Sequence, residues 1–339
     1  MRSNGSRPLR TTIHDVARLA EVSVSTVSRY LNGSPHVSEE ARRRIELAVR
    51  KLMYRPSQTA RTMRTRHSRT LGLVIPDIAH PFFAEVIRGA EEAAATRGYT
   101  VFLVNTAENP EKERQLLEAL VDKDVDGILY GGGFQLDGLG RNMYEMPVVV
   151  IDREINLPQA HAILVDNLAG ACEATAHLLA EGRRRIAVLT GPRRHRTNFD
   201  RYEGFVKASQ EAGRDLTAAP NAETVVSIDA GREAVLAWLD SGMRFDAIFA
   251  ANDLLAVGAL QALSERQIGV PADCAVVGFD NITLSALVRP ALTTVDQPKY
   301  EMGRLGAEYL IREIEGEPAL ERRTVLRPRL VVRQSCGPH

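Results

Sequence analysis

The sequence predicts a chain in two parts, a small all-α head of three short helices and a larger α/β body of two doubly wound parallel-sheet subdomains. Residues 12–53 carry helix-start signals and apolar residues at helical spacing. From Leu71 onward, short runs rich in Val and Ile alternate with helix-period segments, which is the pattern of parallel sheets covered by crossover helices. About 250 residues of this alternation exceed what one sheet accommodates and suit two.

The first two helices of the head are expected to meet at a tight corner, as a helix-turn-helix. Thr12 and Asp15 have the spacing of a capping box, which starts the first helix, and the second helix starts behind Ser23. The residues expected to pack between the two helices are Ile13, Val16, Ala17, Ala20, Val27, Tyr30 and Leu31.

The outward face of the second helix is short, polar and almost free of acids. A helix of this size can read the major groove of DNA, where its side chains suit base edges and phosphates. The alternative is a helical hairpin with a merely solvated face, and spacing alone leaves that alternative open. The outward residues are Val24, Ser25, Thr26, Ser28, Arg29 and Asn32.

The distribution of charge favours the DNA interpretation. Residues 1–70 hold 15 Lys and Arg against 5 Asp and Glu, a net charge of +10, whereas residues 71–339 hold 28 against 38, a net charge of −10. A basic head on an acidic body indicates that only the head meets a polyanion. Nucleic acid fits better than a membrane surface, because no strongly apolar face accompanies the basic residues.

A third helix is expected from Ser38 to about Met53, with acids in the first turn, where the helix dipole favours them. Its basic side chains stay in water or touch phosphate. After Pro56, residues Ser57–Thr65 form a linker that folds on a partner, because they carry too little apolar surface for a stable isolated helix. The apolar positions of the third helix are Ile45, Leu47, Val49 and Leu52.

The body is expected to begin with the strand at Leu71. The expected strands are Leu71–Ile75, Thr100–Val104, Val125–Tyr130, Val148–Ile151, Ile163–Val165, Arg185–Leu189, Thr224–Ile228, Ala247–Ala250 and Ala275–Phe279. Helices between them include Phe82–Arg97, Asn167–Ala180, Arg201–Ala212, Ala230–Leu239 and Leu254–Glu265.

Polar residues follow several of these strands, where parallel sheets bind their ligands. A ring of Asp and Asn, with Arg201 and an apolar platform from Phe82 or Phe83, would bind a polyhydroxylated molecule such as a sugar. The alternative is that each acid is an N-cap or a loop anchor, and Asp253 in particular resembles the cap of its own helix. The residues at strand ends are Asp77, Asp152, Asn252, Asp253 and Asp280.

Other classes of protein are disfavoured. No run of about 18 apolar residues is present, and the N-terminus lacks the apolar stretch of a secretory signal, so a cytoplasmic protein is expected. Isolated Cys172, Cys274 and Cys336 argue against disulfides, and the histidines lack metal-ligand spacing. No Walker A, GxSxG, HExxH or GxGxxG signature occurs, and the run Gly131–Gly133 is interpreted as a backbone bend beside the cleft.

An ordered series of motifs identifies a resemblance that covers the chain from about Thr11 to Ser335. The motifs are Ile13-His14-Asp15-Val16-Ala17, Val22-Ser23 with Thr26-Val27-Ser28-Arg29, Asn32-Gly33, Val37-Ser38, Tyr54 with Pro56, Ile75-Pro76-Asp77 with Pro81-Phe82-Phe83, Val125-Asp126-Gly127, Ala251-Asn252-Asp253, Val277-Gly278-Phe279-Asp280 and Leu292-Thr293-Thr294-Val295. With these motifs the chain resembles the LacI/GalR family of transcriptional regulators.

The resemblance implies a helix-turn-helix DNA-binding domain at residues 11–56 and a hinge helix with linker at 57–70. An effector-binding and dimerisation domain, similar to periplasmic sugar-binding proteins, would follow at 71–335. Its first subdomain would span about 71–164 and 294–325, and its second about 165–293 and 326–335, joined by three crossovers. The resemblance implies a regulator rather than an enzyme, with no cofactor and no metal.

The resemblance also implies roles for single residues of the head. Val24, Ser25 and Arg29 match base-reading positions, and arginine can bond guanine with two hydrogen bonds. Ala60 and Met63 match the hinge residues that enter the minor groove, although the family usually places leucine at the position of Met63. Residues that match phosphate contacts are Ser23, Thr26, Ser28, Asn32 and Ser38.

In the body, seven residues match positions that line the effector cleft of the family. Arg201 and Asp280 are expected to be opposed anchors from different subdomains that hold the cleft closed around one ligand. The seven matching residues are Phe82, Phe83, Asp152, Thr197, Arg201, Asn252 and Asp280.

Together these features predict a homodimeric repressor, associated with the nucleoid, that binds a pseudo-palindromic double-stranded DNA operator. A small-molecule effector, a sugar or a related metabolite, would control operator affinity by shifting the balance of two conformations. A dimer is favoured over a tetramer because no leucine heptads follow Ser335. A solute receptor with an anchoring head and a sugar-modifying enzyme are the alternatives.

Overall fold

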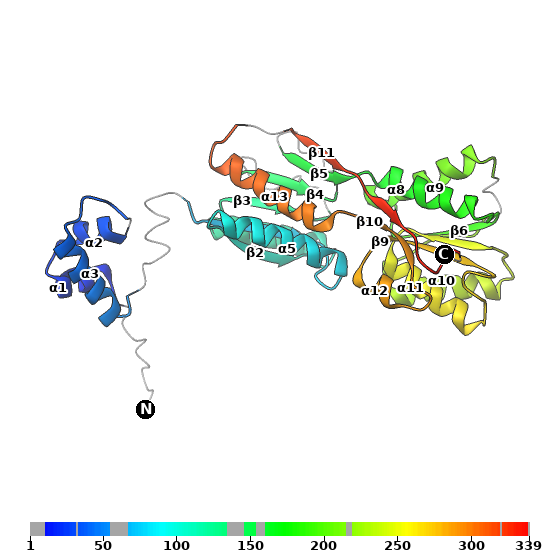
Figure 1. Cartoon of the computed structure of the whole chain (residues 1–339), viewed down its shortest axis with the longest axis horizontal. Helices are drawn as coiled ribbons and strands as arrows, with labels where there is room; N and C mark the ends of the chain where they lie inside the picture. Colours follow the sequence, from blue (N-terminus) through cyan, green and yellow to red (C-terminus); the bar gives the residue numbers. More distant parts are fainter. Residues whose placement is uncertain are drawn as a thin grey trace, which may run out of the picture. The chain divides into compact units, whose positions relative to one another are not determined.

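A computed structural model describes residues 11–31, 33–54, 67–133, 146–153, 160–214, 219–318 and 321–337. The chain divides into two compact units, Met1–Ser68 and Arg69–His339 (Figure 1). The predicted linker Ser57–Thr65 lies outside the described residues. In the part of the chain that is described, no helix is both long and apolar enough to cross a membrane.

The first unit contains the three predicted helices, α1 (Ile13–Ala20), α2 (Val24–Leu31) and α3 (Glu39–Lys51). The predicted capping box at the start of α1 is present: Asp15 N–H donates to the Thr12 hydroxyl, and Thr12 N–H donates to the Asp15 carboxylate. The fully buried centre of the unit consists of Val16, Ala17, Ala20, Val27, Val37, Ala41, Ile45 and Ala48.

The prediction that Leu47 is one of the packed apolar residues of α3 is wrong. Leu47 is 68% exposed, because the buried stripe of α3 consists of Ala41, Ile45 and Ala48, and Leu47 points away from that stripe at about 100° per residue. The small side chains of Ala41 and Ala48 let α3 pack closely on the other two helices. The thin core therefore depends on alanines as much as on large apolar residues.

The second unit contains two six-stranded sheets, as the alternating pattern predicted. The first sheet has the order β11-β5-β4-β3-β1-β2, with all strands parallel. Its strands are β1 (Thr70–Ile75), β2 (Thr100–Asn105), β3 (Gly127–Tyr130), β4 (Val148–Ile151), β5 (His161–Val165) and β11 (Arg323–Leu326). Helices α5 (Pro81–Thr96), α6 (Pro110–Asp122) and α13 (Lys299–Ile314) pack on it.

The second sheet has the order β12-β10-β9-β8-β6-β7, in which only β12 is antiparallel to its neighbour. Its strands are β6 (Ile186–Thr190), β7 (Asn221–Glu223), β8 (Ala247–Ala250), β9 (Ala275–Asp280), β10 (Thr293–Asp296) and β12 (Arg329–Val331). Its helices are α8 (Asn167–Ala180), α9 (Arg196–Glu211), α10 (Ile228–Asp240) and α11 (Asp253–Glu265), and the short α12 (Thr283–Leu287) follows β9.

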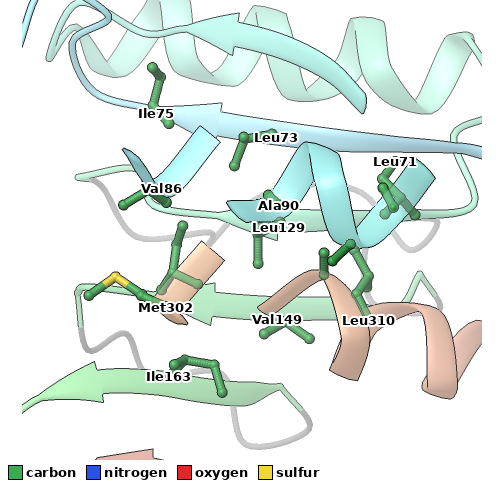
Figure 2. Packing of buried hydrophobic residues seen from close by; sticks show 14 of the residues in the cluster. Leu71, Leu73, Ile75, Val86, Ala90, Leu129, Val149, Ile163, Met302 and Leu310 are labelled. Carbon is green, nitrogen blue, oxygen red and sulfur yellow. The ribbon is translucent and has the colours of Figure 1, made fainter. Parts of the chain in front are cut away.

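Successive strand residues face opposite sides of each sheet and enter different cores. On β1, Leu73 and Ile75 enter the core under α5 and α13, whereas Val74 enters the core under α6. Both faces are covered, so the strands are almost continuously apolar rather than alternating. Figure 2 shows part of the first core, in which side chains of adjacent strands meet Val86 and Ala90 of α5 and Met302 and Leu310 of α13.

Paired helices cover three of these faces, and glycines let them approach closely. A Cβ on Gly303 of α13 would lie 1.9 Å from the Val86 carbonyl oxygen of α5, and a Cβ on Gly89 would lie 2.1 Å from the Tyr300 carbonyl oxygen. No side chain fits in such a gap, so these two glycines set the distance between α5 and α13.

Two sequence assignments of the body need correction. The expected strand Thr224–Ile228 is a loop and a helix start: β7 ends at Glu223, and the Ser227 side chain accepts a hydrogen bond from Ala230 N–H to cap α10. The second subdomain was expected to end at 293, yet β10 pairs with β9 as far as Asp296. Strand β10 therefore belongs to the second sheet, through its hydrogen bonds with β9, and the chain returns to the first sheet only after β10.

Candidate functional site

A cavity of about 380 Å³ opens where the carboxyl ends of strands from both sheets meet. Its volume lies within the range of about 300–1,000 Å³ that is typical of small-molecule sites. Strand order places ligand sites at this edge of parallel sheets. All seven residues that the sequence assigned to an effector cleft line this cavity: Phe82, Phe83, Asp152, Thr197, Arg201, Asn252 and Asp280.

The first-sheet wall combines an apolar surface with a buried acid. Phe82 and Phe83, at the start of α5, are both buried, with ring centroids 5.0 Å apart and ring planes nearly perpendicular. Asp152 follows β4 with a positive φ of 64° and is 9% exposed. Its Oδ1 is buried and accepts no hydrogen bond from the described residues, and burial raises the pKa of its carboxyl group.

The second-sheet wall centres on Arg201 of α9, which is 5% exposed. Its guanidinium donates to Asn167 Oδ1 at 2.8 Å and to the Ala251 carbonyl oxygen at 2.7 Å, and it lies 4.0 Å from the Phe279 ring centroid. Nη1 also lies 3.2 Å from Asp280 Oδ1. These contacts hold the guanidinium in one place.

The expectation that Arg201 and Asp280 are opposed anchors from different subdomains is wrong. Arg201 lies on α9 and Asp280 ends β9, so both belong to the second sheet and its helices. They form a buried ion pair with each other. Because each charge needs a partner when it is removed from water, the pair neutralises itself and leaves no charged anchor facing the opposite wall.

Asp253 is also placed differently from the sequence interpretation. Asn252 is the N-cap of α11, whose side-chain oxygen accepts from Leu254 N–H at 2.8 Å. Asp253 is fully buried, accepting hydrogen bonds from Ile282 N–H at 2.9 Å and from the Thr294 hydroxyl at 2.5 Å. Burial and nearby Asp280 raise the pKa of Asp253 to about 8. Asp253 therefore stabilises the wall behind the cavity rather than lining it.

Asn252 connects the two sides of the cavity. Its Nδ2 donates to Asp280 Oδ2 and lies 3.1 Å from Nε2 of His80, the N-cap residue of α5 on the first-sheet side. The Nδ1 atom of His80 meanwhile accepts from Phe82 N–H at 3.3 Å. A neutral imidazole has only one accepting nitrogen, so it cannot satisfy both contacts at once. A ligand oxygen atom in the cavity, beside both nitrogen atoms rather than between them, would accept from both.

Several cavity residues were missed by the sequence analysis. Arg153 directly follows Asp152, His195 precedes α9, and Gln297 follows β10. The position of Arg153 after a strand was a usable signal, but β10 was not among the expected strands and α9 was expected to start only at Arg201. Arg153 Nη1 and His195 Nδ1 lie 3.4 Å apart across the cavity, and burial lowers the pKa of His195 to about 4.

Four residues that line the cavity carry buried polar atoms without partners among the described residues. They are both acceptors and donors, and a buried polar atom that lacks a partner is costly. A molecule rich in hydroxyl groups could satisfy both kinds. The four atoms are Asp152 Oδ1, Gln297 Oε1, Arg153 Nε and His195 Nε2.

In the head, the predicted DNA-contacting residues gather at the start of α2 and along its outer face. The Ser23 hydroxyl lies 2.8 Å from the hydroxyls of Ser25 and Thr26, and it accepts from Thr26 N–H at 3.1 Å. Val24, Ser28 and Arg29 belong to the same helix, and Arg29 is exposed. Ser38 caps α3 through Ala41 N–H. Asn32, Ala60 and Met63 lie outside the described residues.

Comparison with known proteins covers both parts of the chain. Residues 12–57 match the family described as bacterial regulatory proteins of the lacI family, and residues 175–336 match the periplasmic binding protein-like domain. The chain is 41% identical to the ribose operon repressor of Halalkalibacterium halodurans over 330 residues, which cover 96% of this chain and 97% of that repressor.

Solved structures show the same likeness. The lac repressor dimer bound to operator and the anti-inducer ONPF superposes with a TM-score of 0.88 at 26% identity, over 96% of this chain and 99% of that one. The complex of the transcriptional regulator CelR with cellobiose superposes with a TM-score of 0.72 at 32% identity, over 96% and 100% of the two chains.

Proposed function

Because the chain belongs to the LacI family of bacterial regulatory proteins, we propose that it is a repressor whose operator affinity is controlled by a small molecule bound in the cavity of the second unit. The observation that carries this proposal is the cavity itself. Residues from both sheets line it, and several of them carry buried hydrogen-bond donors and acceptors without partners among the described residues. The relatives are named as repressors and regulators, which confirms that the chain is a regulator and not an enzyme.

The DNA-binding part comprises residues 11–56, with α2 in the major groove. Arg29, Ser25 and Val24 read base edges. Ser25 and Arg29 are exposed on α2, whereas Val24, at the start of the helix, is half-buried against the core of the head. Hydroxyl groups at the start of the helix contact the backbone, where helix N-termini favour phosphate. The residues proposed to contact phosphate are Ser23, Thr26, Ser28, Asn32 and Ser38.

Residues 57–70 comprise the hinge and a linker, and residues 57–65 become helical when two copies meet in the minor groove at the centre of a pseudo-palindromic operator. Ala60 and Met63 enter the groove there. The working form is a homodimer, since two heads are needed for two half-sites. The lac repressor, a structural neighbour, is a dimer in its complex with operator. Such a repressor acts in the cytoplasm, at the nucleoid.

The effector is a small polyhydroxylated molecule, of monosaccharide rather than polymer size. Asp152 Oδ1 and Gln297 Oε1 accept from hydroxyl groups, and Phe82 and Phe83 support the apolar face of a sugar ring. Named relatives point the same way, since one represses a ribose operon and another is complexed with cellobiose. Binding between the sheets shifts their relative position and thereby the spacing of the two hinges.

The test of DNA reading compares two arginine variants of the full chain. A duplex selected from a random pool is titrated by fluorescence anisotropy at about 50 and 200 mM salt. Arg29→Ala should lose about 1–3 kcal/mol on the selected duplex and relax its sequence preference. Arg18→Ala is the matched control, because Arg18 lies on α1 with its side chain 81% exposed. Equal affinity of the wild type and the Arg29 variant would contradict the assignment.

A thermal-shift screen of the full chain tests the effector. Neutral sugars, sugar phosphates and sugar acids are added singly, and the ligand should raise Tm by mass action. Asp152→Ala should reduce that increase, because the substitution removes an acceptor inside the cavity. If no polyhydroxylated compound raises Tm, the proposed effector class is wrong.

A further inference from the structure

One end of the cavity is built from the start of α9. This helix has 16 residues, and its N-cap residue, His195, makes no side-chain capping hydrogen bond. Thr197 and Asn198, in the first turn, are both buried and both line the cavity. The positive end of the helix dipole therefore lies at the cavity wall, where it favours negative charge.

His195 adds a buried donor at this end. It is 6% exposed, and its Nδ1 lies 3.4 Å from Arg153 Nη1. A guanidinium group can only donate, so Nδ1 accepts and the proton of the neutral ring sits on Nε2. Nε2 is buried and no described residue accepts from it. His195, which lines the cavity, thus carries an N–H donor that no described residue satisfies.

Arg153 supplies the positive charge. Its Nη1 faces His195 and its Nη2 lies 3.4 Å from Glu108 Oε1, whereas its Nε is buried without an acceptor among the described residues. The glycine run after β3 makes room for this guanidinium, because a Cβ on Gly133 would lie 2.4 Å from Arg153 Nη1. The run is therefore more than a bend beside the cleft.

The two arginines of the cavity differ in how they are neutralised. Arg201 has a buried carboxylate partner, Asp280, at 3.2 Å. Arg153 pairs with Glu108, whose side chain is 46% exposed and whose contact is longer, at 3.4 Å, and its charge also acts on the buried Asp152. Because an exposed carboxylate is screened by water, Glu108 neutralises Arg153 less than the buried Asp280 neutralises Arg201.

We propose that Arg153, His195 and the first turn of α9 form a subsite for an oxyanion that the effector carries, either a phosphate ester or a carboxylate. Arg153 Nε–H and His195 Nε2–H donate to its oxygen atoms, and the helix terminus faces its charge. The sugar part occupies the remainder of the cavity, beside Asp152 and Phe82. This inference rests on the proposed function and narrows the effector to an acidic sugar derivative.

The experiment measures Tm and calorimetric affinity of the full chain with D-ribose, D-ribose 5-phosphate and D-ribonate, and separately with inorganic phosphate against chloride at equal ionic strength. At least one acidic pentose should bind about tenfold or more tightly than D-ribose, since hydrogen bonds to charged groups are the strong ones. Inorganic phosphate alone should raise Tm. The phosphate and the ribonate distinguish the two sources of the oxyanion.

Two substitutions should move the selectivity in opposite directions. Arg153→Gln should reduce the preference for the acidic pentose about tenfold and abolish the Tm increase from phosphate. Glu108→Gln should increase that preference, because it removes the carboxylate that competes for Arg153. Arg244→Gln is the charge-matched control, since Arg244 is exposed and lies outside the cavity lining.

The outcomes separate this inference from the proposed function. If D-ribose or another neutral sugar binds as tightly as its acidic counterpart, the oxyanion subsite is refuted and the sugar effector stands. The same conclusion follows if Arg153→Gln leaves the preference and the phosphate effect unchanged. If no sugar of either kind binds and phosphate has no effect, the proposed effector class and the subsite are both refuted, and the assignment as a DNA-binding repressor is decided by the Arg29→Ala titration.

Discussion

Replacing Arg201 by methionine should destabilise the second unit strongly, although methionine fills much of the same volume. The side chains of Arg201 and Asp280 are 6% and 3% exposed, and their charges lie 3.2 Å apart. Without the guanidinium, the Asp280 carboxylate stays buried, and its remaining donors among the described residues are the amides of Asn252 and Gln297, while the Lys299 ammonium donates to the Asp280 backbone carbonyl. Removing one partner of a buried pair costs about 3–5 kcal/mol.

For a unit of this size, that cost corresponds to a decrease in Tm on the order of 10 °C. The assay is thermal unfolding of the full chain by circular dichroism, without ligand or DNA, for both single variants and the double variant. Arg201→Met combined with Asp280→Asn should cost less than the sum of the single changes, because the double variant buries no unpaired charge. A cost below about 1 kcal/mol for Arg201→Met, or strict additivity, would refute the reasoning.

Two further outcomes follow from the packing and the buried acid. Gly303→Ala should lower the free energy of unfolding by several kcal/mol, because its Cβ would lie 1.9 Å from the Val86 carbonyl oxygen and would force α5 and α13 apart. An unchanged thermal unfolding curve would contradict that contact. Burial raises the pKa of Asp253 from its ordinary value of 3.8 to about 8, so between these two values the folded state holds a proton that the unfolded state has lost. The free energy of unfolding should therefore fall as pH rises from about 4 to about 8 and level off above that. Asp253→Asn should remove that part of the pH dependence in denaturation curves between pH 6 and 9, and an identical slope in both proteins would show that Asp253 does not titrate there.

Much of the fold could be predicted because local signals and burial agree. The capping box at Thr12 and the Val-rich runs of both sheets sit where the sequence placed them. The prediction of a strand at Thr224–Ile228 was wrong, because an apolar run at the start of a helix resembles a strand in sequence. The capping hydrogen bond of Ser227 starts α10 there instead. The prediction that Leu47 packs in the core was wrong, because the buried face of α3 is the one that carries Ala41 and Ala48, whose small side chains allow close packing.

The cavity shows the same division. Residues that directly follow strands, such as Asp152 and Asn252, could be assigned because topology brings strand ends together. The pairing of Arg201 with Asp280 could not be foreseen, since it depends on how α9 lies against the end of β9. His195 carried no signal at all, because its importance comes from a contact with Arg153 across the cavity.

The central claim, that the cavity governs DNA binding, is tested most directly by one titration. The affinity of the full chain for its selected operator duplex is measured by fluorescence anisotropy, with and without a saturating concentration of the compound that the thermal-shift screen identifies. The operator Kd should change by at least about tenfold, a coupling free energy of about 1.4 kcal/mol. The same Kd under both conditions, with the compound bound, would contradict the account.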